Sequence, residues 1–244
     1  MPPIEINGQT VSDVVVNGQS VDEVTANGQT VFTAIPGVVV DDFEWGGPVS
    51  DRYSATNGDI NDWSIDSDEP VREGINSLKY PPISQGGGIV SNEGDGSNYY
   101  PQVGDGIWSW VQVTDSGGSP QTGFFAPTDA DVRQGHSVEI NDRDDEINIY
   151  VDGTTPVVTI SQTWTVGQWY LVRVDTAEDN GDFKTRVRVH DGPVRDDDII
   201  INETHTDADS NILSNNSFGF ADFREYGSAY DQVLANPDGG DPNI

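Results

Sequence analysis

Short stretches in which apolar and polar residues alternate fill most of the chain, and nothing between Val38 and Leu234 has helical periodicity over a useful length. Alternation with a period of two is typical of a β-strand that buries one face. Clusters of Gly, Asp, Asn and Pro separate the stretches, as turns require. The clearest predicted strands cover residues 106–113, 146–153, 156–164, 168–175 and 183–192. Strands at this spacing predict an all-β fold in which two antiparallel sheets pack as a jelly-roll sandwich.

The N-terminal segment follows a different pattern, a short repeat. Asn-Gly-Gln, followed by Thr or Ser and then Val, occurs at Asn7, Asn17 and Asn27. Asn-Gly is the preferred pair of a type I′ turn, and short apolar stretches flank it, so each copy predicts a β-hairpin. We therefore expect three regions along the chain. These are a meander of very short strands over residues 1–36, a jelly roll over 37–235 and a flexible tail over 236–244.

Strands this short cannot bury a core by themselves, so the repeat needs a partner. One alternative is that it decorates an edge of the chain's own main domain. The alternative we favour is a core shared by identical copies around a symmetry axis, most simply in a homo-trimer. The side chains expected at that axis are those of Val11, Val14, Val21, Val24 and Val31. The repeat also resembles the short β repeats at the ends of phage and archaeal-virus tail and fibre proteins.

The charge balance is extreme, with 42 acidic residues against 11 basic ones and a formal net charge of −31. So much like charge opposes a compact state at ordinary ionic strength, but at 1 M salt the Debye length falls to about 3 Å. The composition therefore predicts a halophile's protein that works at high salt. A calcium-loaded extracellular protein is the competing explanation. A nucleic-acid partner is disfavoured, because phosphate contacts need clustered Lys and Arg.

The chain contains no cysteine, so neither disulfides nor thiolate chemistry are available to it. No apolar run approaches the roughly 20 residues of a membrane span, so we expect no membrane insertion. The opening residues MPPIEI lack the charged and apolar regions of a signal peptide. If the protein works outside a cell, we expect a route other than general secretion, such as release in a virus particle by lysis.

Five stretches carry a resemblance to a known group of folds. They are VDDFEWG (40–46), VREGINSLKY (71–80), INDRDDEINIYVDG (140–153), VGQWYLVRVD (166–175) and AYDQVLA (229–235). In this order they resemble the landmarks of concanavalin A-like, laminin-G-like jelly rolls and of jelly-roll carbohydrate-binding modules. They are similar in particular to the "DDFE" domains of haloarchaea and their viruses. The resemblance implies fold more than function, because this fold serves lectins, hydrolases and inert structural proteins.

The same resemblance implies a structural Ca²⁺ ion. In the carbohydrate-binding members, a glutamate of the first "FE" pair and an aspartate of the closing strand hold it. The matching positions here are Glu44 and Asp231, with backbone carbonyls expected to complete the oxygen shell that Ca²⁺ requires. The ion would tie the first strand to the last. The alternative is two solvated carboxylates in an acidic protein.

Two tryptophans are the best candidates for a glycan platform. Trp108 and Trp110 lie two residues apart, so on a strand they share one face, which Gln112 continues. Indole rings stack on sugars, but the alternative that we favour is that the pair fills the core between the sheets. Tyr99 and Tyr100 lie in a glycine-rich stretch that predicts a loop, where recognition residues are common.

Catalysis is not expected from this sequence. Glycoside hydrolysis needs two carboxylates about 5 to 10 Å apart across the sugar, and acids are too abundant here for pairs to be informative. The Glu-x-Asp-x-x-Glu strand of the glucanases of this fold is missing, and the acidic stretch 142–149 is expected in a hairpin turn. His136, His190 and His205 are dispersed and suggest no Ser-His-Asp constellation.

Three functions therefore stand as hypotheses. We favour a structural protein at the surface of a haloarchaeal virus particle, such as a tail fibre, spike or turret. Its repeats would oligomerise or dock to other virion proteins, and its jelly roll would attach to a host glycan or glycoprotein. The first alternative is a cellular carbohydrate-binding module without catalytic activity, and the second is a glycoside hydrolase. A symmetric oligomer would favour the first hypothesis, a monomer that binds polysaccharide would favour the second, and release of sugar is required by the third.

Overall fold

The computed structural model describes residues 38–236 apart from residues 46, 69–71, 73, 84–85, 92–100, 128–129, 194–197, 209–210, 215–216 and 224–225. Between residues 5 and 33 it describes the backbone of six short strands. The only helical elements in these residues are four 3₁₀ turns: η1 (Val49–Asp51), η2 (Ile60–Asp62), η3 (Val132–Gln134) and η4 (Asn211–Ser214). No helix in the described part of the chain could span a membrane.

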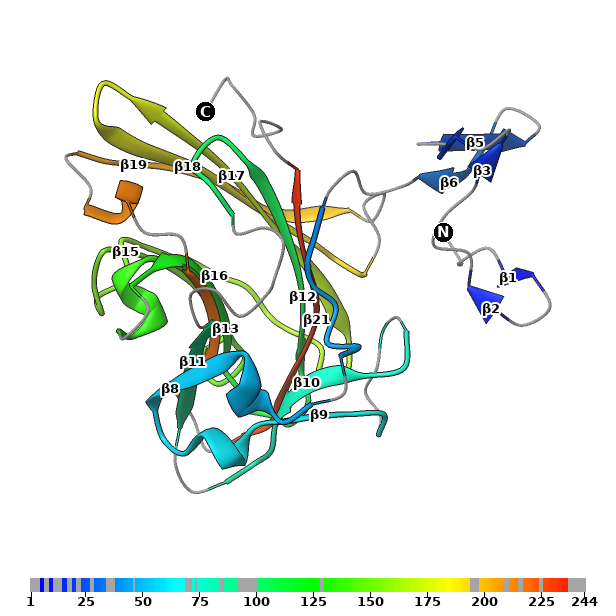
Figure 1. Ribbon diagram of the computed structural model, residues 1–244. Helices are drawn as coiled ribbons and strands as arrows, with labels where there is room; N and C mark the ends of the chain where they lie inside the picture. Colours follow the sequence, from blue (N-terminus) through cyan, green and yellow to red (C-terminus); the bar gives the residue numbers. More distant parts are fainter. Residues whose placement is uncertain are drawn as a thin grey trace.

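The larger of two packed sheets has eight antiparallel strands (Figure 1). In spatial order they are β19 (Ile199–Asp207), β18 (Asp182–His190), β17 (Trp169–Asp179), β12 (Gly106–Val113), β21 (Ser228–Asn236), β10 (Ser77–Tyr80) and β9 (Ser64–Asp66), with β7 (Val38–Asp41) also paired to β21. The closing strand β21 therefore lies in the middle of the sheet, beside the first strand of the sandwich.

The smaller sheet has seven antiparallel strands and forms the other layer in Figure 1. Its order is β16 (Val158–Ser161), β15 (Glu146–Val151), β14 (His136–Asn141), β13 (Pro120–Ala126), β20 (Ser217–Asp222), β11 (Gly87–Ser91) and β8 (Tyr53–Asn57). All five strands that alternation predicted most clearly are present, with ends shifted by a few residues. The predicted two-sheet jelly-roll sandwich is confirmed.

The core lies between the sheets and is built from the inward positions of each strand. Ile147, Ile149 and Val151 are buried at alternate positions of β15, as the period of two requires. Aromatic rings fill the centre, where the rings of Phe220 and Tyr230 from opposite sheets lie 4.8 Å apart between centroids. Alternation therefore leaves every second side chain of each strand on an outer face of the sandwich.

Each Asn-Gly pair of the N-terminal repeat joins two paired strands. The hairpins are β1 (Glu5–Ile6) with β2 (Gln9–Thr10), β3 (Val15–Val16) with β4 (Gln19–Ser20), and β5 (Glu23–Ala26) with β6 (Gln29–Thr33). Their register leaves two residues in each loop, as a type I′ turn requires. The hairpins are confirmed, but the described strands form three separate two-stranded sheets and not the expected meander.

Candidate functional site

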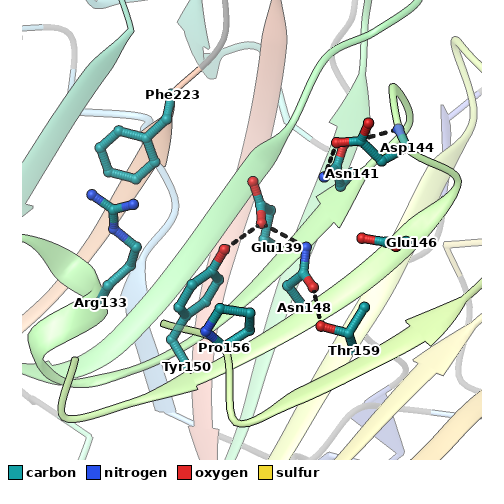
Figure 2. Close-up of a pocket in the computed structure, with 10 residues that line it drawn as sticks. All are labelled: Arg133, Glu139, Asn141, Asp144, Glu146, Asn148, Tyr150, Pro156, Thr159 and Phe223. Atoms are coloured by element: carbon teal, nitrogen blue, oxygen red, sulfur yellow. Dashed lines mark hydrogen bonds between the residues drawn. The ribbon is translucent and has the colours of Figure 1, made fainter. Parts of the chain in front are cut away.

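A polar groove lies on the outer face of the smaller sheet, over the hairpin of β14 and β15 (Figure 2). It measures about 560 Å³, and its lining residues are Arg133, Glu139, Asn141, Asp144, Glu146, Asn148, Tyr150, Pro156, Thr159 and Phe223. Because Val138 and Ile140 point into the core, Glu139 and Asn141 point outward. The register Glu139↔Asn148 then brings polar side chains of both strands together.

A hydrogen-bond relay fixes the centre of the groove. The Thr159 hydroxyl donates to Asn148 Oδ1 (2.7 Å), which turns the amide nitrogen of Asn148 toward Glu139. Asn148 Nδ2 donates to Glu139 Oε2 (3.0 Å), and the Tyr150 hydroxyl donates to the same oxygen (2.7 Å). No described residue donates to Glu139 Oε1. The carboxylate is therefore held rigidly by one oxygen, and the other has no described donor.

Arg133 closes one end of the groove, opposite Asn141, Asp144 and Glu146 (Figure 2). Its Nε and Nη2 atoms donate to the two oxygens of Asp131 (3.0 and 2.6 Å). The guanidinium carbon lies 3.9 Å from the centroid of the Phe223 ring. Burial opposes the charged form, but the hydrogen bonds to Asp131 outweigh it and raise the pKa of Arg133. The guanidinium is thus a fixed cation with Nη1 still able to donate.

Two glycines let η3 dock on the sheet and carry Arg133 to this position. A Cβ atom at Gly219 would lie 2.2 Å from the Ile89 carbonyl oxygen and 2.8 Å from Val132 Cγ1. A Cβ atom at Gly123 would lie 2.9 Å from Val132 Cβ. Val132 is fully buried in this contact, so the neighbouring Arg133 is held against the rim of the groove.

Sequence reasoning missed this groove. It treated residues 142–149 as acidic turn residues and compared carboxylates along one strand. The usable signal was the alternation of Glu139, Asn141, Glu146, Asn148 and Tyr150 with aliphatic residues on both arms of one hairpin. Such large polar side chains, facing outward in pairs, form a site only once the register of the two strands is known.

The expected tryptophan platform is not open in the structure. Trp108, Trp110 and Gln112 do share one face, the outer face of the larger sheet, but the two indoles are only 2% and 1% exposed. The guanidinium carbons of Arg173 and Arg72 lie 4.4 and 3.9 Å from the Trp108 and Trp110 ring centroids. Because each indole lies under an arginine and is almost completely buried, neither has a ring face open to a sugar. The indoles do not fill the core between the sheets either.

Two polar groups of that face are engaged in hydrogen bonds to backbone carbonyls. Trp110 Nε1 donates to the Pro193 carbonyl oxygen (2.8 Å), and Gln112 Nε2 donates to that of Gly167 (2.9 Å). Other predicted site residues lie outside the described residues: Tyr99, Tyr100, Val11, Val14 and Val21. Val24 and Val31 lie in β5 and β6, whose side chains are not described. Their roles remain predictions.

The carboxylate of Glu44 is surrounded by N–H donors. Its Oε1 accepts from the backbone nitrogens of Ile75 (2.7 Å) and Asn76 (2.9 Å), and its Oε2 accepts from Asn76 Nδ2 (3.2 Å). Gly74, at φ 72°, makes room for this contact, because a Cβ atom there would lie 2.2 Å from Glu44 Oε1. Glu44 therefore ties the turn after β7 to the loop before β10.

Among the described residues, the surroundings of Glu44 and Asp231 supply no oxygen shell for the expected calcium ion, which stays a prediction. Asp231 is fully buried on the outer face of the larger sheet and accepts from the Arg72 backbone nitrogen (2.9 Å). Both carboxylates thus face N–H groups, whereas Ca²⁺ needs six to eight oxygen ligands. Within the described residues, no group of three or more His, Cys, Asp or Glu side chains could hold a metal ion.

Replacing Glu44 by Ala is expected to lower the melting temperature by about 4–8 °C. Loss of three hydrogen bonds to a carboxylate should cost about 2 kcal/mol net, and each kcal/mol shifts the melting temperature of a domain this size by about 2–4 °C. Thermal melts with and without a chelator would check it, with Glu178→Ala at an exposed position as the control. A shift that depends on the chelator would contradict the hydrogen-bond role and show that a cation shares the site.

No protein-family model and no curated protein matches the chain. Solved structures do match it. A carbohydrate-binding module from Bacillus subtilis, CBM66, is 14% identical over 75% of this chain and 94% of its own, with a TM-score of 0.46. The winged bean acidic lectin complexed with methyl-α-D-galactose is 9% identical over 82% and 96%, with a TM-score of 0.47. A structure described under endo-acting O-glycanases of the human gut microbiota is 16% identical over 82% and 98%, with a TM-score of 0.46. The likeness to these jelly rolls concerns the sandwich alone and identifies no ligand.

Proposed function

We propose that the chain binds an uncharged glycan in the groove of the smaller sheet and catalyses no reaction there. The observation that carries this proposal is the relay that holds Glu139 by Oε2 and leaves Oε1 as a fixed acceptor. A carboxylate placed in this way suits hydroxyl donors. It also keeps its geometry without a ligand, so little ordering cost is incurred on binding.

The rest of the lining supports a ligand rich in hydroxyl groups. Asn141 and Asp144 add amide and carboxylate groups next to Glu139, and Arg133 Nη1 adds a donor at the opposite end (Figure 2). The Phe223 and Tyr150 rings supply apolar surface between these polar groups. A few convergent polar groups beside aromatic surface are the usual composition of a small-molecule site, and 560 Å³ lies within the usual range of volumes.

The charges of the groove favour a glycan without acidic groups. Glu139, Asp144 and Glu146 all line it, whereas its one cation, Arg133, is already paired with Asp131. The whole chain carries a net charge of −31, so a uronate or sulfate would meet repulsion both at a distance and on contact.

Binding to panels of uncharged and acidic polysaccharides in molar salt tests this function. We expect wild-type protein to retain at least one uncharged glycan, and Glu139→Gln to weaken that interaction about tenfold or more. A hydrogen bond to a charged group is worth about 1.5–3 kcal/mol, and 1.4 kcal/mol corresponds to tenfold in affinity. Glu178→Gln, the same change at an exposed position of the larger sheet, should bind like wild type.

Three outcomes would contradict the proposal. These are failure of wild-type protein to bind any member of the uncharged panel, equal binding by the Glu139→Gln and Glu178→Gln variants, and preference for the acidic panel. Analysis of the soluble products in the same mixtures separates binding from hydrolysis, because release of reducing sugar would require an enzyme.

Attachment to a host glycan from the surface of a haloarchaeal virus particle remains part of this proposal. Its support is the acidic composition and the three Asn-Gly hairpins, which suit a repeated segment that assembles with copies of itself or with another virion protein. A cellular carbohydrate-binding module would use the same groove. The groove supports glycan binding equally in either setting.

A further inference from the structure

The larger sheet ends at β19, whose outer edge is unpaired among the described strands (Figure 1). β19 has nine residues, whereas β9, β8 and β16, at the other sheet ends, have three, five and four. Its register with β18 runs without interruption from Ile201 to Asp207. A regular edge of this length presents a row of unpaired N–H and C=O groups to which another strand can pair.

The sequence of β19 guards this edge only in part. Proteins commonly place proline, lysine, a bulge or inward-pointing charges in such a strand. IIINETHTD contains neither proline nor lysine, and its register shift against β18 lies at its start, between Ile199 and Ile201. Five of its side chains are β-branched, which favours strand pairing: Ile199, Ile200, Ile201, Thr204 and Thr206. Glu203 and Asp207 face the inner side of the sheet. These two inward-facing carboxylates therefore restrict which strands can pair with this edge.

From Asn202 to Thr206, the side chains of β19 are complementary to themselves in an antiparallel pairing centred on Thr204, whereas the next pair, Ile201 opposite Asp207, adds no polar contact. Thr204 would lie opposite Thr204 of the second copy, Glu203 opposite His205, and Asn202 opposite Thr206. Opposed acid–base pairs and opposed hydroxyl and amide groups stabilise neighbouring strands. Glu203 and His205 have no hydrogen-bond or ion-pair partner among the residues that the structure describes, so both remain free for such a contact.

The strand beside this edge lowers the repulsion between two acidic chains. Lys184, Arg186 and Arg188, three of the eleven cations, alternate along the outer face of β18. In the structure Lys184 pairs with Asp179 (2.7 Å), Arg188 pairs with Asp175, and Arg186 donates to Asn202 (2.8 Å). The surface next to β19 therefore lacks the acidic excess of the chain as a whole.

We propose that β19 is a self-association edge. A second copy of the chain adds its own β19 antiparallel, centred on Thr204, so that the two larger sheets become one continuous sheet across a two-fold axis. The partner is a second copy because the side-chain order matches itself, and a closed two-fold contact consumes both edges. The proposal does not depend on the glycan groove, which lies on the other sheet.

A single cysteine tests the contact directly, because the chain has none of its own. Directly opposed residues of antiparallel strands have Cα atoms about 4.5–5.5 Å apart, which matches the spacing that a disulfide needs. We expect full-length Thr204→Cys, oxidised mildly in molar salt, to run mostly as a covalent dimer on a non-reducing gel. Thr204 is exposed, so the substitution should leave the fold intact, as circular dichroism would verify.

Two further cysteine variants act as controls. Two copies of Thr206→Cys would be offset by four residues, or about 13 Å along the paired strands, and should stay monomeric on the gel. Ser161→Cys lies exposed on β16, the short edge strand of the smaller sheet, and should also stay monomeric. A Thr204→Cys dimer yield no higher than that of the two controls would overturn the proposal.

Exchanging the opposed acid and base tests the register independently. In the Thr204→Cys background, Glu203→Lys should reduce the covalent dimer several-fold. Glu203→His combined with His205→Glu should restore the dimer, because the acid and the base then exchange positions and still lie opposite each other across the pairing. Persistence of the dimer in the lysine variant, or its absence in the exchanged variant, would overturn the Thr204-centred pairing.

Discussion

Lowering the salt concentration from about 1 M to 0.1 M is expected to lower the melting temperature by on the order of 10 °C, because the Debye length rises from about 3 to 10 Å. A shift of this size corresponds to about 3 kcal/mol for a domain of this length. The net charge of −31 is the cause. Circular dichroism melts across a KCl series would measure the effect.

The distribution of the acids supports a strong salt dependence. Six described acids are buried, namely Asp41, Asp105, Glu139, Asp175, Asp222 and Asp231. The other described acids lie at least partly in solvent, where dissolved ions can screen them. Charges at the surface respond to salt much more than buried, paired ones. The repulsion that opposes folding is therefore of the kind that salt removes.

A non-electrolyte control separates screening from a general effect of cosolutes. Sucrose is excluded from protein surfaces and stabilises compact states without screening charge. In 0.1 M KCl, sucrose should therefore recover less of the lost stability than KCl does at equal osmolality. An unchanged melting temperature across the KCl series would refute the interpretation of the acidic composition as an adaptation to high salt.

The fold was largely predictable because its signals are local. Alternation identified β12 at its observed bounds and located the other core strands, and Asn-Gly located the hairpin loops. The role of Phe43 in the DDFE stretch was not predictable. The residue adopts φ 57°, its nitrogen donates to Asp41 Oδ1 (2.8 Å), and its ring is buried against Phe220. This turn is a packing device that only the assembled core reveals.

The functional residues were less predictable because their surroundings come from distant segments. The pattern correctly placed Trp108 and Trp110 on one face, but it could not show that Arg72 and Arg173 cover them. The groove around Glu139 likewise depends on the register of β14 with β15 and on the docking of η3. Composition made every carboxylate look equivalent. What distinguishes Glu139 is that both of its hydrogen-bond donors bind one carboxylate oxygen, Oε2, at the centre of the groove.

A buried histidine should make the stability fall at acidic pH. His136 begins β14, is fully buried beside the Phe183 ring, and neither of its ring nitrogens has a hydrogen-bond partner among the described residues. Burial, with a smaller contribution from the charge of His205, lowers the pKa of His136 from 6.5 to about 3. The folded state therefore holds a neutral imidazole throughout the pH range in which the unfolded chain takes up a proton.

The sign of the effect follows from proton uptake. Between pH 6.5 and about 3 the unfolded state binds more protons at this residue, so stability decreases as the pH falls, by about 1.4 kcal/mol per unit. His136→Leu removes this term and the unpaired buried nitrogens. We expect the free energy of unfolding of the variant, relative to that of wild type, to be higher at pH 4.5 than at pH 7.5 by on the order of 3 kcal/mol.

Denaturant titrations of both proteins at both pH values, at constant molar salt, would measure this difference. The titration of the many carboxylates cancels, because both proteins share it. His205→Gln should keep most of the wild-type slope, because burial is the main cause. Equal pH slopes for wild type and His136→Leu would mean that His136 accepts a proton in the folded protein.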